Sequence, residues 1–142
     1  MHFAVGDFGS GTLHLSNGTI YNQIGFIGAV TGSTGTANVS GGSWLNAHDF
    51  AVGNGGNGTL NLSGDGLVSS RSVIVAGVAG ITGNLNLNGG TLRTGQVGEG
   101  GGTGSVTFNG GTLQLTGDQS TLFSGFEVGD VVLTNSGGTI DT

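Results

Sequence analysis

The most regular feature of the sequence is a short alternation of apolar and polar residues that returns along the whole chain. Each copy begins with Gly and a Thr-like residue, continues as apolar, polar, apolar, and ends at small residues followed by another apolar residue. Five copies begin at Gly11, Gly35, Gly58, Gly83 and Gly104, and a looser sixth spans residues 131–140. Because strand side chains alternate between two faces, each copy predicts a short strand, a tight corner and a second strand.

A second motif, an apolar residue, a spacer, an apolar residue and then Gly, lies between these copies. Its closing glycines, Gly6, Gly28, Gly53, Gly77, Gly98 and Gly129, are 22, 25, 24, 21 and 31 residues apart. A period of this length with internal alternation predicts a stack of coils with three short strands each. Glycine suits the corners because it adopts positive φ freely. We therefore expect an all-β parallel β-helix, or β-solenoid, of about six coils, with residues 1–142 as one domain.

Stacking predicts inward rows of like residues, about 4.8 Å apart from coil to coil. The first two rows are predicted to contain Leu13, Ala37, Leu60, Leu85 and Val106, and Leu15, Val39, Leu62, Leu87 and Phe108. The third is predicted to contain Ile20, Trp44, Leu67, Leu92, Leu113 and Ile140, and the fourth Val5, Ile27, Val52, Ala76, Val97 and Val128. We interpret Trp44 as core filler or a partly exposed corner ring, with a ligand platform as the alternative.

One turn is longer than the others. Residues 116–125 stretch the fifth coil, and we expect an outward excursion in which Leu122 and Phe123 fold back on the stack. Long loops on regular scaffolds often carry function. A variation in packing is the other explanation of this segment.

The outward positions of the first strand predict a flat, uncharged surface. Its two rows are Thr12, Thr36, Thr59, Asn84 and Ser105, and His14, Asn38, Asn61, Asn86 and Thr107. Three interpretations remain open: a solvated ladder that hydrogen-bonds along each row, an adhesive or self-associating face, and an ice-binding face. His14 and the mixture of Thr, Asn and Ser disrupt the regularity that matching an ice lattice requires.

Composition narrows the classes of partner. The chain has 34 Gly, no Pro and no Cys, so it has neither disulfides nor thiolate metal sites. Arg71 and Arg93 are the only strong cations, and the net charge of −6 argues against nucleic acid or anionic membrane as partners. No apolar run approaches the roughly 18 residues of a spanning helix, so we expect no membrane insertion. The first residues lack a signal peptide and already belong to the repeat, which suggests a fragment of a longer chain.

No catalytic, cofactor-binding or metal-binding residues are predicted. The glycine-rich segments lack the Lys of a phosphate-binding loop. A periodic calcium roll needs Asp where Thr59 stands, although an ion at one turn remains open. Asp7 and Glu99 are expected four coils apart, beyond the roughly 5–9.5 Å of paired hydrolytic carboxylates. The remaining groups are the acidic residues Asp118, Glu127 and Asp130, interpreted as solvated loop charge, and the scattered His2, His14 and His48.

The motifs resemble a known family. Copies such as Gly58-Thr59-Leu60-Asn61-Leu62-Ser63 are similar to the repeats of autotransporter (type V secretion) passenger domains of Gram-negative bacteria. The segments 111–115, 122–126 and 137–142 resemble the autotransporter-associated β-strand repeat. The resemblance implies a right-handed β-helix, secretion to the bacterial cell surface, and roles in adhesion, aggregation or spacing. No catalytic motif of the family has a counterpart here.

These observations predict a non-catalytic structural or adhesive segment of a secreted or surface-displayed bacterial protein. The alternative is a ligand-binding face, for carbohydrate or ice, formed by the outward Thr and Asn rows. We expect no cofactor. The expected partners are further copies, bound through uncapped ends or lateral faces, and a host or cell-surface glycan.

Overall fold

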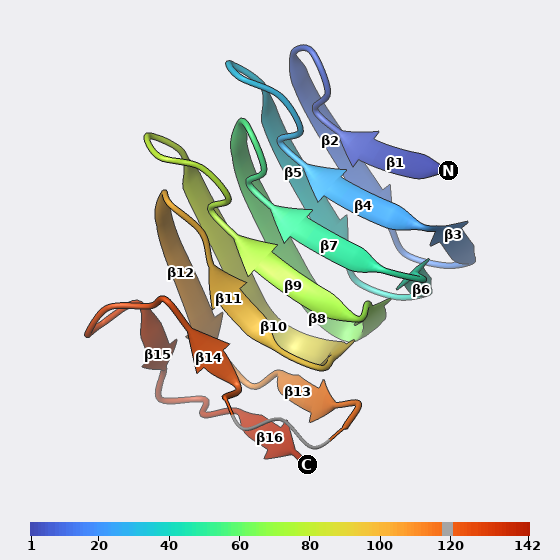
Figure 1. The fold of residues 1–142 in the computed structure, drawn as a ribbon. Helices are drawn as coiled ribbons and strands as arrows, with labels where there is room; N and C mark the ends of the chain where they lie inside the picture. The colour runs from blue at the N-terminus through green and yellow to red at the C-terminus, as the bar shows by residue number, and fades with distance from the viewer. Residues whose placement is uncertain (118–120) are drawn as a thin grey trace.

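A computed structural model describes residues 1–117 and 121–142, which form one stack of parallel β coils (Figure 1). A six-stranded sheet takes one strand from each coil, and a ten-stranded sheet supplies the remaining two sides. Every strand pairing is parallel and joins a coil to the next coil along the chain. The predicted all-β parallel β-solenoid of about six coils, with up to three strands per coil, is confirmed.

The three sides of the stack are named here face A, face B and face C. Face A is the six-stranded sheet, formed by β1 (His2–Val5), β4 (Ile24–Ile27), β7 (Asp49–Val52), β9 (Ser72–Val75), β11 (Val97–Glu99) and β14 (Phe123–Ser124). Face B contains β2 (Ser10–Leu15), β5 (Thr34–Val39), the first halves of β8 (Asn57–Ser69) and β10 (Thr82–Thr94), β12 (Thr103–Phe108) and β15 (Val131–Leu133). Face C contains β3 (Thr19–Asn22), β6 (Ser43–Asn46), the second halves of β8 and β10, β13 (Thr112–Leu115) and β16 (Thr139–Asp141).

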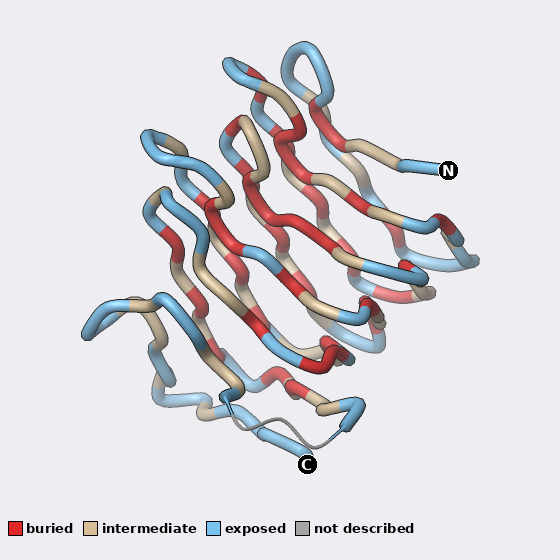
Figure 2. Tube along the Cα trace, viewed as in Figure 1, coloured by how far each residue is buried: buried red, intermediate tan, exposed pale blue. Residues whose placement is uncertain are grey.

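The first two inward rows lie on face B as predicted. Leu13 pairs with Ala37, and this register continues through Leu60 and Leu85 to Val106. The second row runs in parallel, and both rows continue into β15 of the sixth coil. In coils two to five these side chains are buried and form the centre of the core, as Figure 2 shows. Uninterrupted alternation within each strand therefore fixed the direction of its side chains.

The third row differs from the prediction at one position. Trp44 is in register with Val68 rather than Leu67, and Val68 is fully buried while Leu67 lies on the outer side. The cause is one additional residue at the corner of β8, where the register with β10 shifts. The prediction for Leu67 is wrong because the alternation does not reveal how many residues a glycine-rich corner contains.

The fourth row is wrong in its last three members. Val52 is in register with Val75, so Ala76 lies at the following corner with a φ of 54°. Val97 pairs with Val73 and therefore belongs to the neighbouring inward row. Glu99, in register with Val75, takes the fourth-row position in coil five, and its Oε1 accepts a hydrogen bond from the Gly104 N–H. This bond gives one carboxylate oxygen a partner where coils one to four place an aliphatic side chain.

The predicted strand at residues 126–129 is also wrong. Phe123 and Ser124 form β14 and pair with Val97 and Gly98, whereas Val128 lies in a turn and is exposed. Leu122 and Phe123 do fold back on the stack, because both pack against the core. Within the predicted excursion at 116–125, residues 118–120 lie outside the described residues.

A buried polar row, which the sequence analysis missed, lines the corner between faces C and A. Its members are Asn22, Asn46, Ser70 and Thr94. Asn22 Nδ2 donates to Asn46 Oδ1 at 2.6 Å, and Asn22 Oδ1 accepts from the indole Nε1 of Trp44 at 2.7 Å. Trp44 is fully buried and packs edge-on against Phe3 and Phe50, so it is core filler rather than a corner ring.

Candidate binding surface

The two predicted outward rows lie side by side on face B. Thr12 is in register with Thr36, and the row continues through Thr59 and Asn84 to Ser105. The same pairings align the second row, which contains His14, Asn38, Asn61, Asn86 and Thr107. Alternation in the five copies therefore predicted both rows residue by residue. Their alignment makes a flat surface with one polar side chain per coil in each row.

Hydrogen bonds between coils tie the second row together. Asn61 Nδ2 donates to Asn38 Oδ1 at 2.9 Å, and Asn86 Nδ2 donates to Asn61 Oδ1 at 2.9 Å. We call this run of three residues the asparagine ladder. All three side chains are half-buried by their neighbours. The ladder holds each amide in one orientation, so a ligand meets groups that are already ordered.

The first row is joined more loosely. Ser105 Oγ donates to Asn84 Oδ1 at 2.9 Å, and Asn84 Nδ2 reaches Thr59 Oγ1 at 3.5 Å. In coil one, Thr12 and His14 are exposed. The part of face B with ordered side chains therefore extends from coil two to coil five. It offers hydroxyl and amide groups but no charge, which suits neutral polar ligands rather than ionic ones.

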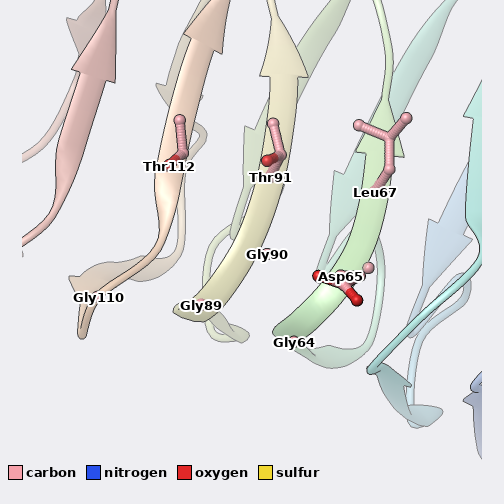
Figure 3. Close-up of a pocket in the computed structure, with 9 residues that line it drawn as sticks. Gly64, Asp65, Leu67, Gly89, Gly90, Thr91, Gly110 and Thr112 are labelled. Atoms are coloured by element: carbon pink, nitrogen blue, oxygen red, sulfur yellow. The ribbon is translucent and has the colours of Figure 1, made fainter.

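A groove follows the bend between faces B and C, beside these rows (Figure 3). It has a volume of about 520 Å³, and glycines of β8, β10 and the β12–β13 corner form its base. Asp65, Leu67, Thr91 and Thr112 also line it. The sequence indicated the corners but not the groove, because its width depends on how three corners stack.

Face A carries an ion pair between coils three and four. Arg71 Nη2 lies 3.1 Å from Asp49 Oδ1, and Ser72 Oγ donates to the same oxygen at 2.8 Å. Partial burial raises the pKa of Asp49. The hydrogen bonds from Ser72 and Arg71 and the charges of Arg71 and His48 together lower it by more, so the pKa falls below its ordinary value. The side chains of Arg71 and Asp49 are 68% and 37% exposed, so the pair contributes at most about 1 kcal/mol.

The outer side of face A carries an apolar stripe. Ala4, Phe26, Ala51 and Ile74 follow one another in register, and their side chains point away from the core. Ile74 is exposed, and Phe26 packs edge-on against His2. Ala4, Phe26 and Ala51 are spacers of the second motif, but Ile74 is the first residue of its copy, so the motif did not reveal the stripe.

The titratable groups are dispersed. His2 lies on face A, His14 on face B, and His48 at a corner. Across residues 1–117 and 121–142, no group of three or more His, Cys, Asp or Glu side chains is arranged to hold a metal ion. Asp130 Oδ2 accepts a hydrogen bond from the backbone N–H of Glu127 at 2.8 Å, whereas Asp118 lies outside the described residues.

In the part of the chain that the structure covers, no helix is long and apolar enough to span a membrane.

Comparison with known proteins adds no family assignment. No protein-family model matches the chain, and neither a curated protein nor a solved structure shows significant similarity to it. The fold therefore rests on the structure, and the function must be argued from the surfaces described above.

Proposed function

We propose that the chain is a non-catalytic structural and adhesive segment of a secreted or surface-displayed bacterial protein. The observation that carries this proposal is the outer surface of face B, where uncharged side chains repeat in register and hydrogen-bond from coil to coil. A continuous stack of parallel coils separates what lies at its two ends by a fixed distance, as a stalk requires. Its ordered polar face offers many weak, similar contacts, as an adhesive surface requires.

The resemblance of the repeats to autotransporter passenger domains supports the same proposal. A passenger of this kind is exported and displayed at the outer membrane of a Gram-negative bacterium, and it forms a right-handed β-helix. The lack of cysteine is compatible with that location because parallel strand pairing stabilises every coil. We assign the extracellular location and the right-handed coil on this resemblance.

A second candidate is a carbohydrate-binding face. The groove at the bend favours it, because Asp65, Thr91 and Thr112 place oxygen atoms along a channel beside the asparagine ladder. Sugar hydroxyls pair well with carboxylate, hydroxyl and amide groups. This candidate predicts saturable binding of one class of neutral glycan, whereas the adhesive scaffold predicts weak binding that depends on many copies.

The adhesive role can be tested with beads coated with the chain. Wild-type beads should adhere to one another or to bacterial cells. Introducing two charges into face B, through Thr36→Lys and Thr59→Lys, should reduce adhesion several-fold because each Lys must lose hydration in the contact. The matched control places the same charges in the same coils on face C, through Ser43→Lys and Ser69→Lys, and should retain adhesion.

Equal adhesion of both charged variants would overturn the role of face B. A glycan array probed with these three proteins and with Asp65→Asn distinguishes the second candidate. Saturable binding by free protein, lost on Asp65→Asn but not in the face C control, would replace the scaffold proposal with a lectin-like function.

A further inference from the structure

A second pocket lies on the outer side of face A, around the ion pair between coils three and four. Its volume is about 380 Å³, and it is lined by Asp49, Arg71, Ser72, Gly95 and Gln96. These residues belong to β7, to β9 and the corner before it, and to the corner before β11, three strands that lie side by side in Figure 1. Each of these strands has a paired neighbour on both sides, so the pocket belongs to the middle of the stack. It shares no lining residue with the groove between faces B and C.

The ion pair keeps hydrogen-bonding capacity for a ligand. Asp49 Oδ1 accepts from Arg71 Nε and Nη2 and from Ser72 Oγ, whereas Oδ2 accepts one long bond, from Arg71 Nη2 at 3.3 Å. Within residues 1–117 and 121–142, Arg71 Nη1 donates to no protein atom. The pocket therefore presents a carboxylate acceptor beside guanidinium donors, and the exposed amide of Gln96 in the next coil can both donate and accept. Because Ser72 and Arg71 already fix the carboxylate, little ordering is needed when a ligand binds.

The apolar stripe of face A runs directly beside this polar pocket. Asp49 and Ala51 are two residues apart on β7, as are Ser72 and Ile74 on β9, so polar and apolar side chains are about 7 Å apart on the same outer surface. Ala51 is 5% exposed and lies in register between Phe26 and Ile74, whereas Ile74 is 40% exposed. The small alanine between two larger side chains makes a shallow apolar seat. A ligand that uses both parts needs hydroxyl groups at one edge and an apolar face, which is the chemistry of a sugar ring.

We propose that this pocket on face A binds a neutral sugar residue. The ring hydroxyls hydrogen-bond to Asp49, Arg71 and Gln96. The C–H face of the same ring packs against Ala51 and Ile74. The site lies on a different face from the asparagine ladder and from the groove, so this proposal goes beyond both functions proposed above.

Charge and solvation select a neutral sugar over other ligands. An acidic sugar or a phosphate would bring a second anion to Asp49, on a protein whose net charge is −6. A purely apolar ligand would strip water from the ion pair without replacing its hydrogen bonds. A neutral sugar replaces those hydrogen bonds with its own hydroxyls and adds no charge.

Amide NMR spectra of the 142-residue chain test the site directly. The probes are the methyl glycosides of glucose, galactose, mannose, N-acetylglucosamine and glucuronic acid. At least one neutral probe should shift the amide signals of Ser72, Ile74 and Gln96 saturably. Asp49→Asn should weaken binding of that sugar roughly tenfold, because a neutral amide accepts a weaker hydrogen bond than a carboxylate. Ile74→Asn should weaken it roughly fivefold through the loss of apolar contact.

Each variant has a matched control elsewhere on the surface. Asp65→Asn makes the same change in the groove between faces B and C, and Val78→Asn replaces an exposed apolar residue in the corner after β9. Both should bind the sugar like wild type, and circular dichroism should show all four variants folded. Unchanged binding by Asp49→Asn, loss of binding on Asp65→Asn, a preference for glucuronic acid, or no saturable shift with any probe would each overturn the proposal. None of these results affects adhesion through face B, which the coated beads measure separately.

Discussion

At the scale of single residues, the glycine that opens each copy of the repeat, which is the second residue of a face B strand, has a different role from the one its position suggests. A corner glycine is expected to supply positive φ, and Gly6, Gly28 and Gly53 do so. Gly35 has no positive φ, but a Cβ there would overlap the carbonyl oxygen of Val5 and the amide of Gly28. Gly11, Gly58 and Gly83 are crowded by backbone atoms in the same way, whereas a Cβ at Gly104 would meet only side-chain atoms, at 3.1 Å. Glycine is therefore required because two backbones approach too closely for a side chain.

This crowding predicts the cost of adding one methyl group. Gly35→Ala should lower the free energy of unfolding by about 3 kcal/mol, because the methyl must displace backbone atoms. The control is Gly9→Ala, where a Cβ meets nothing within 4 Å and φ is not positive, and it should be neutral or slightly stabilising. Urea titrations followed by circular dichroism measure both. Equal stability of the two variants would show that the backbone can separate at Gly35 without cost.

At the scale of strands, the sequence predicted pairing best where alternation is uninterrupted. On face B, the two inward rows and the two outward rows all follow the predicted register, because alternation within each strand determines which side chains point inward. Leu67 comes directly after a corner and Ala76 lies at one, where one residue more or fewer reverses the face of every following side chain. The polar corner row at Asn22 and Asn46 continues the same alternation, but polar residues at inward positions were not counted as core.

The polar corner row makes a testable contribution to the pairing of coils one and two. Asn22→Ala should destabilise the protein by roughly 2–4 kcal/mol, because it leaves Trp44 Nε1 and Asn46 Oδ1 buried without their partner. The control is Asn38→Ala in the asparagine ladder, which should cost less than about 1 kcal/mol because water reaches the half-buried amide of Asn61. Thermal unfolding of both variants provides the comparison. A similar loss of stability in both would show that the polar corner row has no special role.

At the scale of the whole molecule, stability should depend on position along the stack. Each coil contacts only its neighbours, so a middle coil has two interfaces and an end coil one. The candidate surface follows from the same arrangement: the outer rows were predictable because they repeat. The groove and the apolar stripe on face A were not, since they depend on how the corners and spacers of several coils combine.

Two alanine substitutions in one row test this dependence. Leu62→Ala, in the third coil and fully buried, should cost about 2–5 kcal/mol through the cavity that it leaves. Leu133→Ala, in the last coil of the same row and mostly exposed, should cost less than about 1 kcal/mol. Both values come from urea unfolding of the 142-residue chain. A comparable loss from Leu133→Ala would mean that the last coil is as important to folding as the middle ones.

The hydrogen bonds on face B give its surface a direction. Asn61 donates to Asn38, Asn86 to Asn61 and Ser105 to Asn84, so in each case the later coil donates and the earlier coil accepts. The side-chain dipoles therefore align along the stack instead of cancelling, in the way that peptide dipoles align along a helix. A linear ligand with inequivalent ends, such as a glycan chain or a peptide strand, would consequently bind in one of its two orientations in preference to the other.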